Sequence, residues 1–259
     1  KLADEAGVTA QIVFNNRFLS PVMRAKELID EGRLGKIVSF RCAYLHASCT
    51  DLGKKAGWKQ DRTICGGGVL FDLGSHAIDL VYYLCGRFRG VTGMSQIAHP
   101  VRPGMDGKEW HTNADEAFYM LAELECGAKG TVEASKLAVG ANDDFTCEIY
   151  GEKGAVRIDI MNPNWLEFYD MDDKTGDLGG ERGFKRIECV GRYPAPGGIF
   201  PGVKAPIGWL RGHIGSMYSF LDSVSSHRKA CPSFDDAAHI QRVMEAGYES
   251  DESGRFVLI

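Results

Sequence analysis

The sequence predicts an α+β fold in which a large, mostly antiparallel, open-faced β-sheet carries helices on one face. Two observations carry this prediction. In the middle of the chain, apolar segments follow one another with only short turns between them, which is typical of antiparallel strands and not of alternating βαβ units. Helical spacing of apolar residues, by contrast, is limited to a few segments.

The N-terminal part predicts a helix, a strand and a second helix. Residues 1–9 read as the end of a helix, and the segment TAQIVF (9–14) reads as a short strand. The pair Ser20 and Pro21 predicts the start of the second helix. A serine can cap the first free N–H groups, and a proline lacks the N–H that would be unsatisfied there. Gly32 is expected to end this helix.

The alternating segment KIVSFRCAYLHAS (36–48) predicts a strand that places Tyr44 and His46 on the same face. The Gly- and Pro-rich segment 191–212 is expected to form a long ordered loop, a kind of element that is often functional. Further strands are expected within 118–139, 145–161, 165–171 and 184–190. Two helices are expected to finish the chain, the first with an apolar face made by Met217, Phe220, Leu221 and Val224.

Composition limits the classes of function. The chain has 259 residues, of which 44% are hydrophobic and 25% charged, which is sufficient for a sizeable core. A net charge of −5 provides no basic footprint for nucleic acid. No uninterrupted run of 18 apolar residues and no signal peptide is found, so no membrane-spanning helix is expected. The eight cysteines include no C-x-x-C pair and are interpreted as reduced thiols of a cytoplasmic protein.

The segment GGGVLFDLGSHAIDLVYYL (66–84) brings acids, an imidazole and phenols together on one apolar stretch. If residues 70–84 form a helix with about 100° per residue, Asp72, His76 and Asp79 fall in one narrow sector. They would then line a cleft wall beside the apolar stripe of the helix. No G-x-G-x-x-G or Walker pattern surrounds the glycines, so they are not interpreted as a phosphate-binding loop.

An aspartate one turn before a histidine suits acid–base chemistry on a hydroxyl group. The carboxylate can hold the imidazole tautomer or a substrate hydroxyl, while the imidazole moves a proton near neutral pH, as oxidation of an alcohol requires. Two other interpretations stay open. Asp72 is compatible with a helix cap and His76 with a structural histidine. The pair is also compatible with two metal ligands of a hydrolase or isomerase, although spacing identifies no third ligand.

Two further groups of residues are candidates for contact with a sugar, because aromatic platforms with polar neighbours are typical of such sites. The groups are Tyr44, His46 and Trp58, and Trp209, Arg211 and His213. For both groups, ordinary packing is the alternative. Lys59 and Arg62 precede the glycines and are interpreted as solvated surface in preference to contacts with an anionic substrate.

The motif as a whole resembles the substrate-side signature of the glucose–fructose oxidoreductase, inositol dehydrogenase and rhizopine catabolism (Gfo/Idh/MocA) family. The residues that carry it are Trp58, Gly66, Gly67, Gly68, Leu70, Asp72, Gly74, His76 and Asp79. Three more segments are similar to the family's crossover segment, central hairpin and C-terminus. They are VFNNRFLSP with AKELIDEGRLGKI, IYGEKGAVRID, and PSFDDAAHIQRVMEAGYESDESGRFVLI. The resemblance spans nearly the whole chain.

The resemblance implies an oxidoreductase that transfers a hydride between NAD or NADP and a hydroxyl of a sugar, polyol or inositol-like substrate. It implies that Asp72 positions the reacting hydroxyl, and that His76 is a second acid or base, or shares the proton with the lysine of the family's E-K-P motif, which is the leading proton carrier. It also implies that Asn16 and Arg17, in the crossover segment, lie beside the nicotinamide. The sequence does not distinguish NAD from NADP.

The sequence departs from the family pattern in its N-terminal part. The family's dinucleotide-binding half, with its glycine-rich turn and an E-K-P lysine, is not found in these 259 residues. We therefore expect residues 1–14 to be the end of a cofactor domain, residues 15–259 to be a substrate-binding and oligomerisation domain, and the chain alone to be inactive. The open sheet face predicts a homo-oligomer, a dimer or tetramer. The alternative is a domain-only protein that binds a sugar-like ligand or a partner without catalysis.

Overall fold

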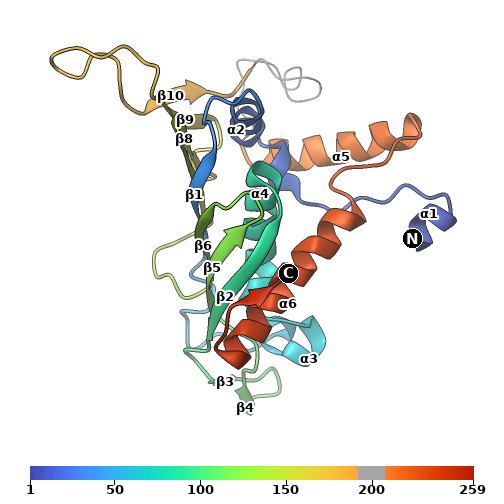
Figure 1. Ribbon diagram of the computed structural model, residues 1–259. Helices are drawn as coiled ribbons and strands as arrows, with labels where there is room; N and C mark the ends of the chain where they lie inside the picture. The colour runs from blue at the N-terminus through green and yellow to red at the C-terminus, as the bar shows by residue number, and fades with distance from the viewer. Residues whose placement is uncertain (192–207) are drawn as a thin grey trace. The chain divides into compact units, whose positions relative to one another are not determined.

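The computed structural model describes residues 1–191 and 208–259 (Figure 1). The chain forms two compact units, each assembled from two stretches of sequence. The first unit comprises residues 1–38 and 148–240, and the second comprises residues 39–147 and 241–259. The domain boundary expected after residue 14 lies inside the first unit and stays a prediction.

The first unit combines short helices with an antiparallel ladder of strands. Its ladder is β8–β9–β10, in which both pairs are antiparallel, as the sequence predicted. Helix α2 packs on β8 and β9. The elements are α1 (Leu2–Glu5), the 3₁₀-helix η1 (Asn15–Phe18), α2 (Ser20–Asp30), β8 (Gly154–Asp159), β9 (Trp165–Asp170), β10 (Lys185–Glu188) and α5 (Leu210–Ser225). Three elements contain residues of both units: β1 (Ile37–Leu45), β7 (Asp144–Gly151) and α6 (Phe234–Ser253).

Two expectations for the N-terminal part are wrong in detail. Residues 9–14 form no strand: the N–H of Ile12 donates to the carbonyl of Pro232, and this segment is not paired with a strand among the described residues. A strand requires the backbone of a neighbouring strand, which apolar alternation alone does not supply. Ser20 is the first residue of α2, as expected, but its hydroxyl makes no cap hydrogen bond.

The loop expected over 191–212 ends earlier than predicted; residues 192–207 lie outside the described residues, and residues 191, 208 and 209 are non-helical, as expected. Helix α5 already begins at Leu210. A Cβ at Gly212 would lie 2.8 Å from the carbonyl oxygen of Asn15, and one at Gly215 would lie 2.8 Å from Cβ of Phe18. Gly212, the last glycine of the expected loop, and Gly215 beyond it are therefore positions where α5 lies close against η1.

The face predicted for α5 is wrong as well. Met217, Leu221 and Val224 are exposed, whereas Ser216 and Ser223 are buried with the start of the helix. Close packing on η1 requires small side chains, so the small and polar face of α5 turns inward. For the last helix, helical spacing predicted a shared face made by Ala237, Ile240, Val243, Met244 and Gly247. In α6, Ala237 is half-buried and the other four are buried.

The second unit is built on a sheet with the strand order β1–β6–β5–β2–β11. Pairing is antiparallel except between β1 and β6, which are parallel, so the expected meander is interrupted there. The sheet confirms a mostly antiparallel α+β fold. Its elements are β1 (Ile37–Leu45), η2 (Trp58–Gln60), α3 (Arg62–Cys65), η3 (Leu70–Gly74), α4 (Ser75–Cys85), β2 (Phe88–Gln96), β3 (Val101–Pro103), β4 (Glu109–His111), β5 (Ala117–Leu124), β6 (Lys129–Ser135) and β11 (Val257–Leu258).

Helices cover one face of this sheet and leave the other open. On β5, Phe118 and Met120 are buried, whereas Tyr119 and Leu121 between and after them are 38% and 62% exposed. A Cβ at Gly247, in the C-terminal half of α6, would lie within 3.3 Å of both Met120 and Phe118. The expectation of helices on one face is confirmed within this unit.

One continuous helical stretch, Arg62–Cys85, is long and apolar enough to cross a membrane by length and composition alone. The sequence reading expected none, because it searched for uninterrupted apolar runs. Within this stretch, 61% of the 18-residue segment that is apolar enough to cross a membrane is buried inside the protein. Leu70, Leu80 and Leu84 are among its buried residues, so core packing accounts for the apolar composition.

Candidate active site

The triple glycine allows a close approach between the helical segment and a neighbouring loop. A Cβ at Gly68 would lie 2.3 Å from the backbone nitrogen of Asp115 and 2.4 Å from its carbonyl oxygen. The Asp115 carboxylate accepts hydrogen bonds from the N–H groups of Gly68 and Leu70, both at 3.0 Å, and from the Tyr248 hydroxyl at 2.6 Å. Asp115 therefore caps the start of the helical segment, a role that the sequence reading missed.

The helical segment itself begins with one π turn, Leu70–Gly74, before it continues as α4. A π turn takes more residues per turn than an α-helix, so the assumed spacing of 100° per residue does not hold across it. Asp72 and His76 face a common cavity, as predicted. Asp79 is 1% exposed and lies in the core, so its expected place on the cleft wall is wrong.

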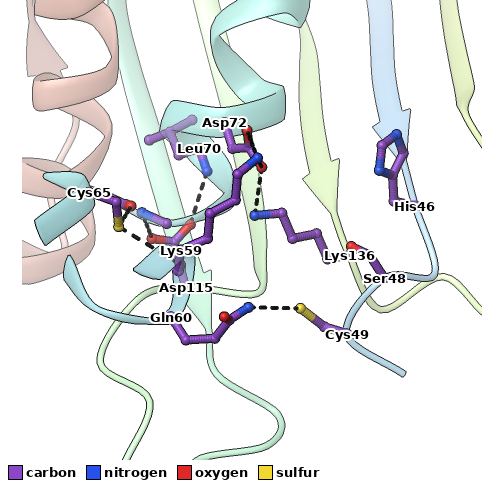
Figure 2. A network of polar contacts seen from close by, with 12 residues as sticks. His46, Ser48, Cys49, Lys59, Gln60, Cys65, Leu70, Asp72, Asp115 and Lys136 are labelled. Carbon is purple, nitrogen blue, oxygen red and sulfur yellow. Dashed lines mark hydrogen bonds and ion pairs between the residues drawn. The ribbon is translucent and has the colours of Figure 1, made fainter. Parts of the chain in front are cut away.

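Asp72 is held by two lysines, which approach its carboxylate from different elements (Figure 2). Lys59, from η2, places its ammonium nitrogen 2.7 and 2.9 Å from the two carboxylate oxygens. Lys136, just after β6, places its ammonium nitrogen 2.8 Å from one of them. Burial alone would raise the pKa of Asp72, but hydrogen bonds from Lys136 and Lys59 outweigh burial and lower it. Asp72 is therefore an ionised acceptor at neutral pH and not a proton donor.

Lys136 is a residue that the sequence reading missed. Its side chain is only 7% exposed, and its backbone N–H donates to the carbonyl of Glu116 on the adjacent strand end. The signal was present, because Val132, Ala134 and Lys136 follow the period of two that marks one face of a strand. A lysine at the end of a buried face predicts a carboxylate partner there, since an unpaired buried charge is costly.

A second polar cluster joins Tyr44 and His46 to Asp143, which was also missed. One oxygen of the Asp143 carboxylate lies 2.8 Å from the Tyr44 hydroxyl and 2.7 Å from Nε2 of His46. Because a carboxylate oxygen accepts, His46 donates its Nε2 proton in this contact. The Tyr44 ring stacks on Phe145 with 4.4 Å between centroids. Burial, followed by the Asp143 carboxylate, raises the pKa of Tyr44, so its phenol stays protonated.

Asp72, Lys136, Tyr44 and His46 line a cavity of about 530 Å³ whose lining residues all belong to the second unit. The size is within the usual range for a small-molecule site. Lys59 and Arg62 are both exposed, as expected: Lys59, 44% exposed, belongs to the cavity wall and pairs with Asp72, and Arg62 lies over the Tyr248 ring. The lining residues are Tyr44, His46, Ser48, Lys54, Lys55, Gly57, Trp58, Lys59, Gln60, Asp72, Leu73, His76 and Lys136. Five predicted site residues are thus brought together: Tyr44, His46, Trp58, Asp72 and His76.

The other predicted site residues lie in the first unit. Asn16 and Arg17 are 6% and 5% exposed, and a guanidinium nitrogen of Arg17 lies 3.9 Å from the Asp236 carboxylate. The rings of Trp209 and His213 are in contact, with 4.1 Å between their centroids. Arg211 is 5% exposed within α5. Contact of these five residues with a cofactor or substrate stays a prediction.

The metal interpretation gains no support from this arrangement. Both Asp72 oxygens already accept from ammonium groups, which repel a cation. Within residues 1–191 and 208–259, no group of three or more His, Cys, Asp or Glu side chains is placed to hold a metal ion. All eight cysteines lie in this part of the chain, and each is a free thiol.

Comparison with known proteins agrees with this fold. Residues 22–157 match the GFO/IDH/MocA C-terminal domain family. Levoglucosan dehydrogenase of Pseudarthrobacter phenanthrenivorans is 27% identical over 95% of this chain and 65% of its own length. An uncharacterised oxidoreductase of Schizosaccharomyces pombe is 31% identical over 98% of this chain and 68% of its own length. A solved structure of levoglucosan dehydrogenase with NADH and levoglucosan has a TM-score of 0.92 at 28% identity, covering 99% of this chain and 67% of the other.

The fold and the cavity thus define an α+β domain in which a carboxylate and an imidazole share one small-molecule pocket. The chain belongs to the Gfo/Idh/MocA family, and the predicted resemblance is confirmed. It spans 65% of the length of the levoglucosan dehydrogenase that it matches.

Proposed function

We propose that this chain provides the substrate-binding and proton-handling site of a NAD- or NADP-dependent oxidoreductase. Its substrate would be a sugar, a polyol or an inositol-like molecule, with one hydroxyl oxidised or the matching carbonyl reduced. Family membership supports the reaction class, and the related levoglucosan dehydrogenase has been solved with NADH and levoglucosan. The single observation that carries the proposal is the ionised Asp72, beside His76, on the wall of the cavity.

The chain's own residues divide the work on the substrate hydroxyl. Asp72 accepts a hydrogen bond from that hydroxyl and orients it, because its lowered pKa keeps it an acceptor. Lys59 and Lys136 hold the carboxylate in place. His76 takes the hydroxyl proton during oxidation and returns it during reduction, since an imidazole gains and loses a proton near neutral pH.

The nicotinamide, when bound, would supply the hydride acceptor or donor. The side chains of Asn16 and Arg17, which the family resemblance places beside the nicotinamide, are buried, and Arg17 faces Asp236. The expectation that the 259-residue chain is inactive on its own gains no support from the comparisons, and a turnover assay with NAD⁺ and NADP⁺ tests it.

The proposal is tested by binding, which is independent of turnover. Levoglucosan, myo-inositol and D-glucose are titrated into the purified chain while the histidine ring signals are followed by NMR. Saturable binding is expected for at least one of them. Asp72→Asn should weaken this binding about tenfold or more, since a charged acceptor is lost. In His76→Gln, the bound ligand should shift the NMR signals of fewer histidine rings than in the wild type. The exposed His111→Gln is the control. Absence of saturable binding by every sugar and polyol, neutral or charged, would contradict the proposal.

Two properties stay predictions of this proposal. The open face of the sheet in the second unit, which includes Tyr119 and Leu121, supports a homo-oligomer formed through that face. A cytoplasmic location is in keeping with eight free thiols. Sedimentation velocity of the purified chain tests the homo-oligomer, which Leu121→Lys should dissociate.

A further inference from the structure

The wall of the cavity carries more positive than negative charge. Four of its lining residues are lysines, Lys54, Lys55, Lys59 and Lys136, and the single lining carboxylate is that of Asp72. The chain as a whole has a net charge of −5, so the excess of positive charge is local to the cavity and opposite in sign to the net charge of the chain. A concave surface lined by one sign of charge concentrates its field inside the cavity.

The charge of the carboxylate on the wall is already balanced by lysines, although its side chain stays 29% exposed. Asp72 accepts from the ammonium groups of Lys59 and Lys136, which together carry twice its charge. Lys54 and Lys55 have no carboxylate partner among the described residues; Lys54 contacts only the carbonyl oxygen of Ser48, at 3.3 Å. Three positive charges on the wall are therefore left without a matching negative charge in the cavity.

Acids close to the cavity are directed elsewhere. The Asp143 carboxylate accepts from Tyr44 and His46. The Asp51 carboxylate accepts from the N–H of Gly53 in its own loop. The Asp61 carboxylate accepts from both the N–H and the hydroxyl of Thr63. None of these three acids lines the cavity, so none offsets Lys54 and Lys55 inside it.

We propose that the ligand of this cavity is a carbohydrate that carries an anionic group, a carboxylate or a phosphate, bound by Lys54 and Lys55 while a hydroxyl of the same molecule contacts Asp72. This inference rests on the proposed function and narrows its substrate class. The two ends of the ligand are recognised by opposite charges, which also fixes its direction in the cavity. An uncharged sugar satisfies only the Asp72 end.

The experiment compares how tightly the purified 259-residue chain binds a neutral sugar, two anionic sugars with the same ring, and inorganic phosphate alone. D-glucose, D-glucuronate, glucose 6-phosphate and inorganic phosphate are titrated by calorimetry at low ionic strength and again in about 0.5 M NaCl, where charge interactions are largely screened. We expect glucuronate or glucose 6-phosphate to bind tighter than glucose, and the added salt to weaken the anionic ligand more. Whichever of glucuronate and glucose 6-phosphate binds tighter shows whether the cavity prefers a carboxylate or a phosphate.

Substitution of Lys55 provides the matched variants. Lys55→Gln should weaken the anionic sugar about two- to fivefold, the range for one exposed ion pair, and Lys55→Glu more strongly, with glucose unchanged. Lys129→Gln and Lys129→Glu, at the start of β6 and 75% exposed, make the same changes in net charge and should leave all affinities unaltered.

The outcomes separate this inference from the proposed function. Equal affinity for glucose and both anionic sugars, or equal effects of the Lys55 and Lys129 variants, would overturn the inference and leave the proposed function standing. Inorganic phosphate bound as tightly as glucose 6-phosphate, with neither glucose nor glucuronate bound, would overturn both, because the cavity would then recognise the phosphate charge and not the carbohydrate.

Discussion

The ammonium nitrogen of Lys136 lies 2.8 Å from a carboxylate oxygen of Asp72, and it joins the end of β6 to the π turn before α4. The lysine is almost completely buried, whereas the aspartate side chain is 29% exposed to the cavity. The Asp72 carboxylate is therefore accessible to a ligand as a hydrogen-bond acceptor, whereas the Lys136 ammonium group stays buried in the cavity wall. This asymmetry determines what each substitution should do.

Asp72→Asn should destabilise the protein more than Lys136→Met does. The neutral amide that replaces the carboxylate would leave the buried ammonium group without a counter-charge, at a cost of about 1–3 kcal/mol after allowance for the exposure of Asp72. In Lys136→Met the carboxylate keeps Lys59 and is partly hydrated, so a cost under about 1 kcal/mol is expected. Urea unfolding of both variants and of the double variant measures these differences. The reverse order would mean that the pair is not coupled as described.

The acid stability of the protein should depend on the same pair. Because the pKa of Asp72 is lower in the folded protein than its usual value of 3.8, its ionisation contributes stability that is present above the unfolded pKa. That contribution is lost as the pH falls through the folded pKa. Lys136→Met should raise the folded pKa and shift acid unfolding to higher pH. Carboxyl NMR titration reports the pKa directly, and a wild-type value at or above 3.8 would contradict the account.

Gly68→Ala should be strongly destabilising, by about 3 kcal/mol or more. A methyl group there would lie 2.3 Å from the backbone nitrogen of Asp115, so either the loop or the helical segment must move. The Asp115 cap on Leu70 would be lost with that movement. Gly183→Ala is the control, since nothing lies within 4 Å of its added Cβ. Thermal unfolding compares them, and similar melting temperatures would show that the close approach is not required.

The loop that carries Lys54 and Lys55 should depend on a buried ion pair. Arg102 is 4% exposed and donates to the Glu116 carboxylate at 2.6 Å and to the carbonyl of Asp51 at 3.0 Å. Glu116→Gln should cost about 3–5 kcal/mol, because the guanidinium stays buried without its counter-charge. Hydrogen exchange should accelerate in residues 49–57 in this variant. Unchanged exchange there would show that the pair does not hold the loop.

Arg89→Gln supplies the matched control for that experiment. Arg89 also pairs with a glutamate across two strands, Glu123, but its side chain is 59% exposed. An exposed pair contributes about 1 kcal/mol or less, so neither stability nor exchange in residues 49–57 should change appreciably.

Local sequence patterns determined most of the elements and the family of this protein. Alternation predicted β1 and the strands from β5 to β10, and the spacing of Asp72 and His76 predicted their shared wall. Such patterns succeed because strand and helix periods decide which side chains share a face. They failed at residues 9–14, which needed a partner strand, and at Asp79, where one π turn changed the period.

Tertiary structure alone decided which distant residues complete the site. Lys136 lies beside Tyr44 and His46 because parallel pairing of β1 with β6 places the ends of both strands at the same edge of the sheet. Lys136 also contacts Asp72, and Asp143, just before β7, contacts Tyr44 and His46. Ion pairing and the state of a carboxylate depend on distance through space, which the order of residues does not contain. The sequence therefore identified the candidate reacting groups, and the fold determined the charges that surround them.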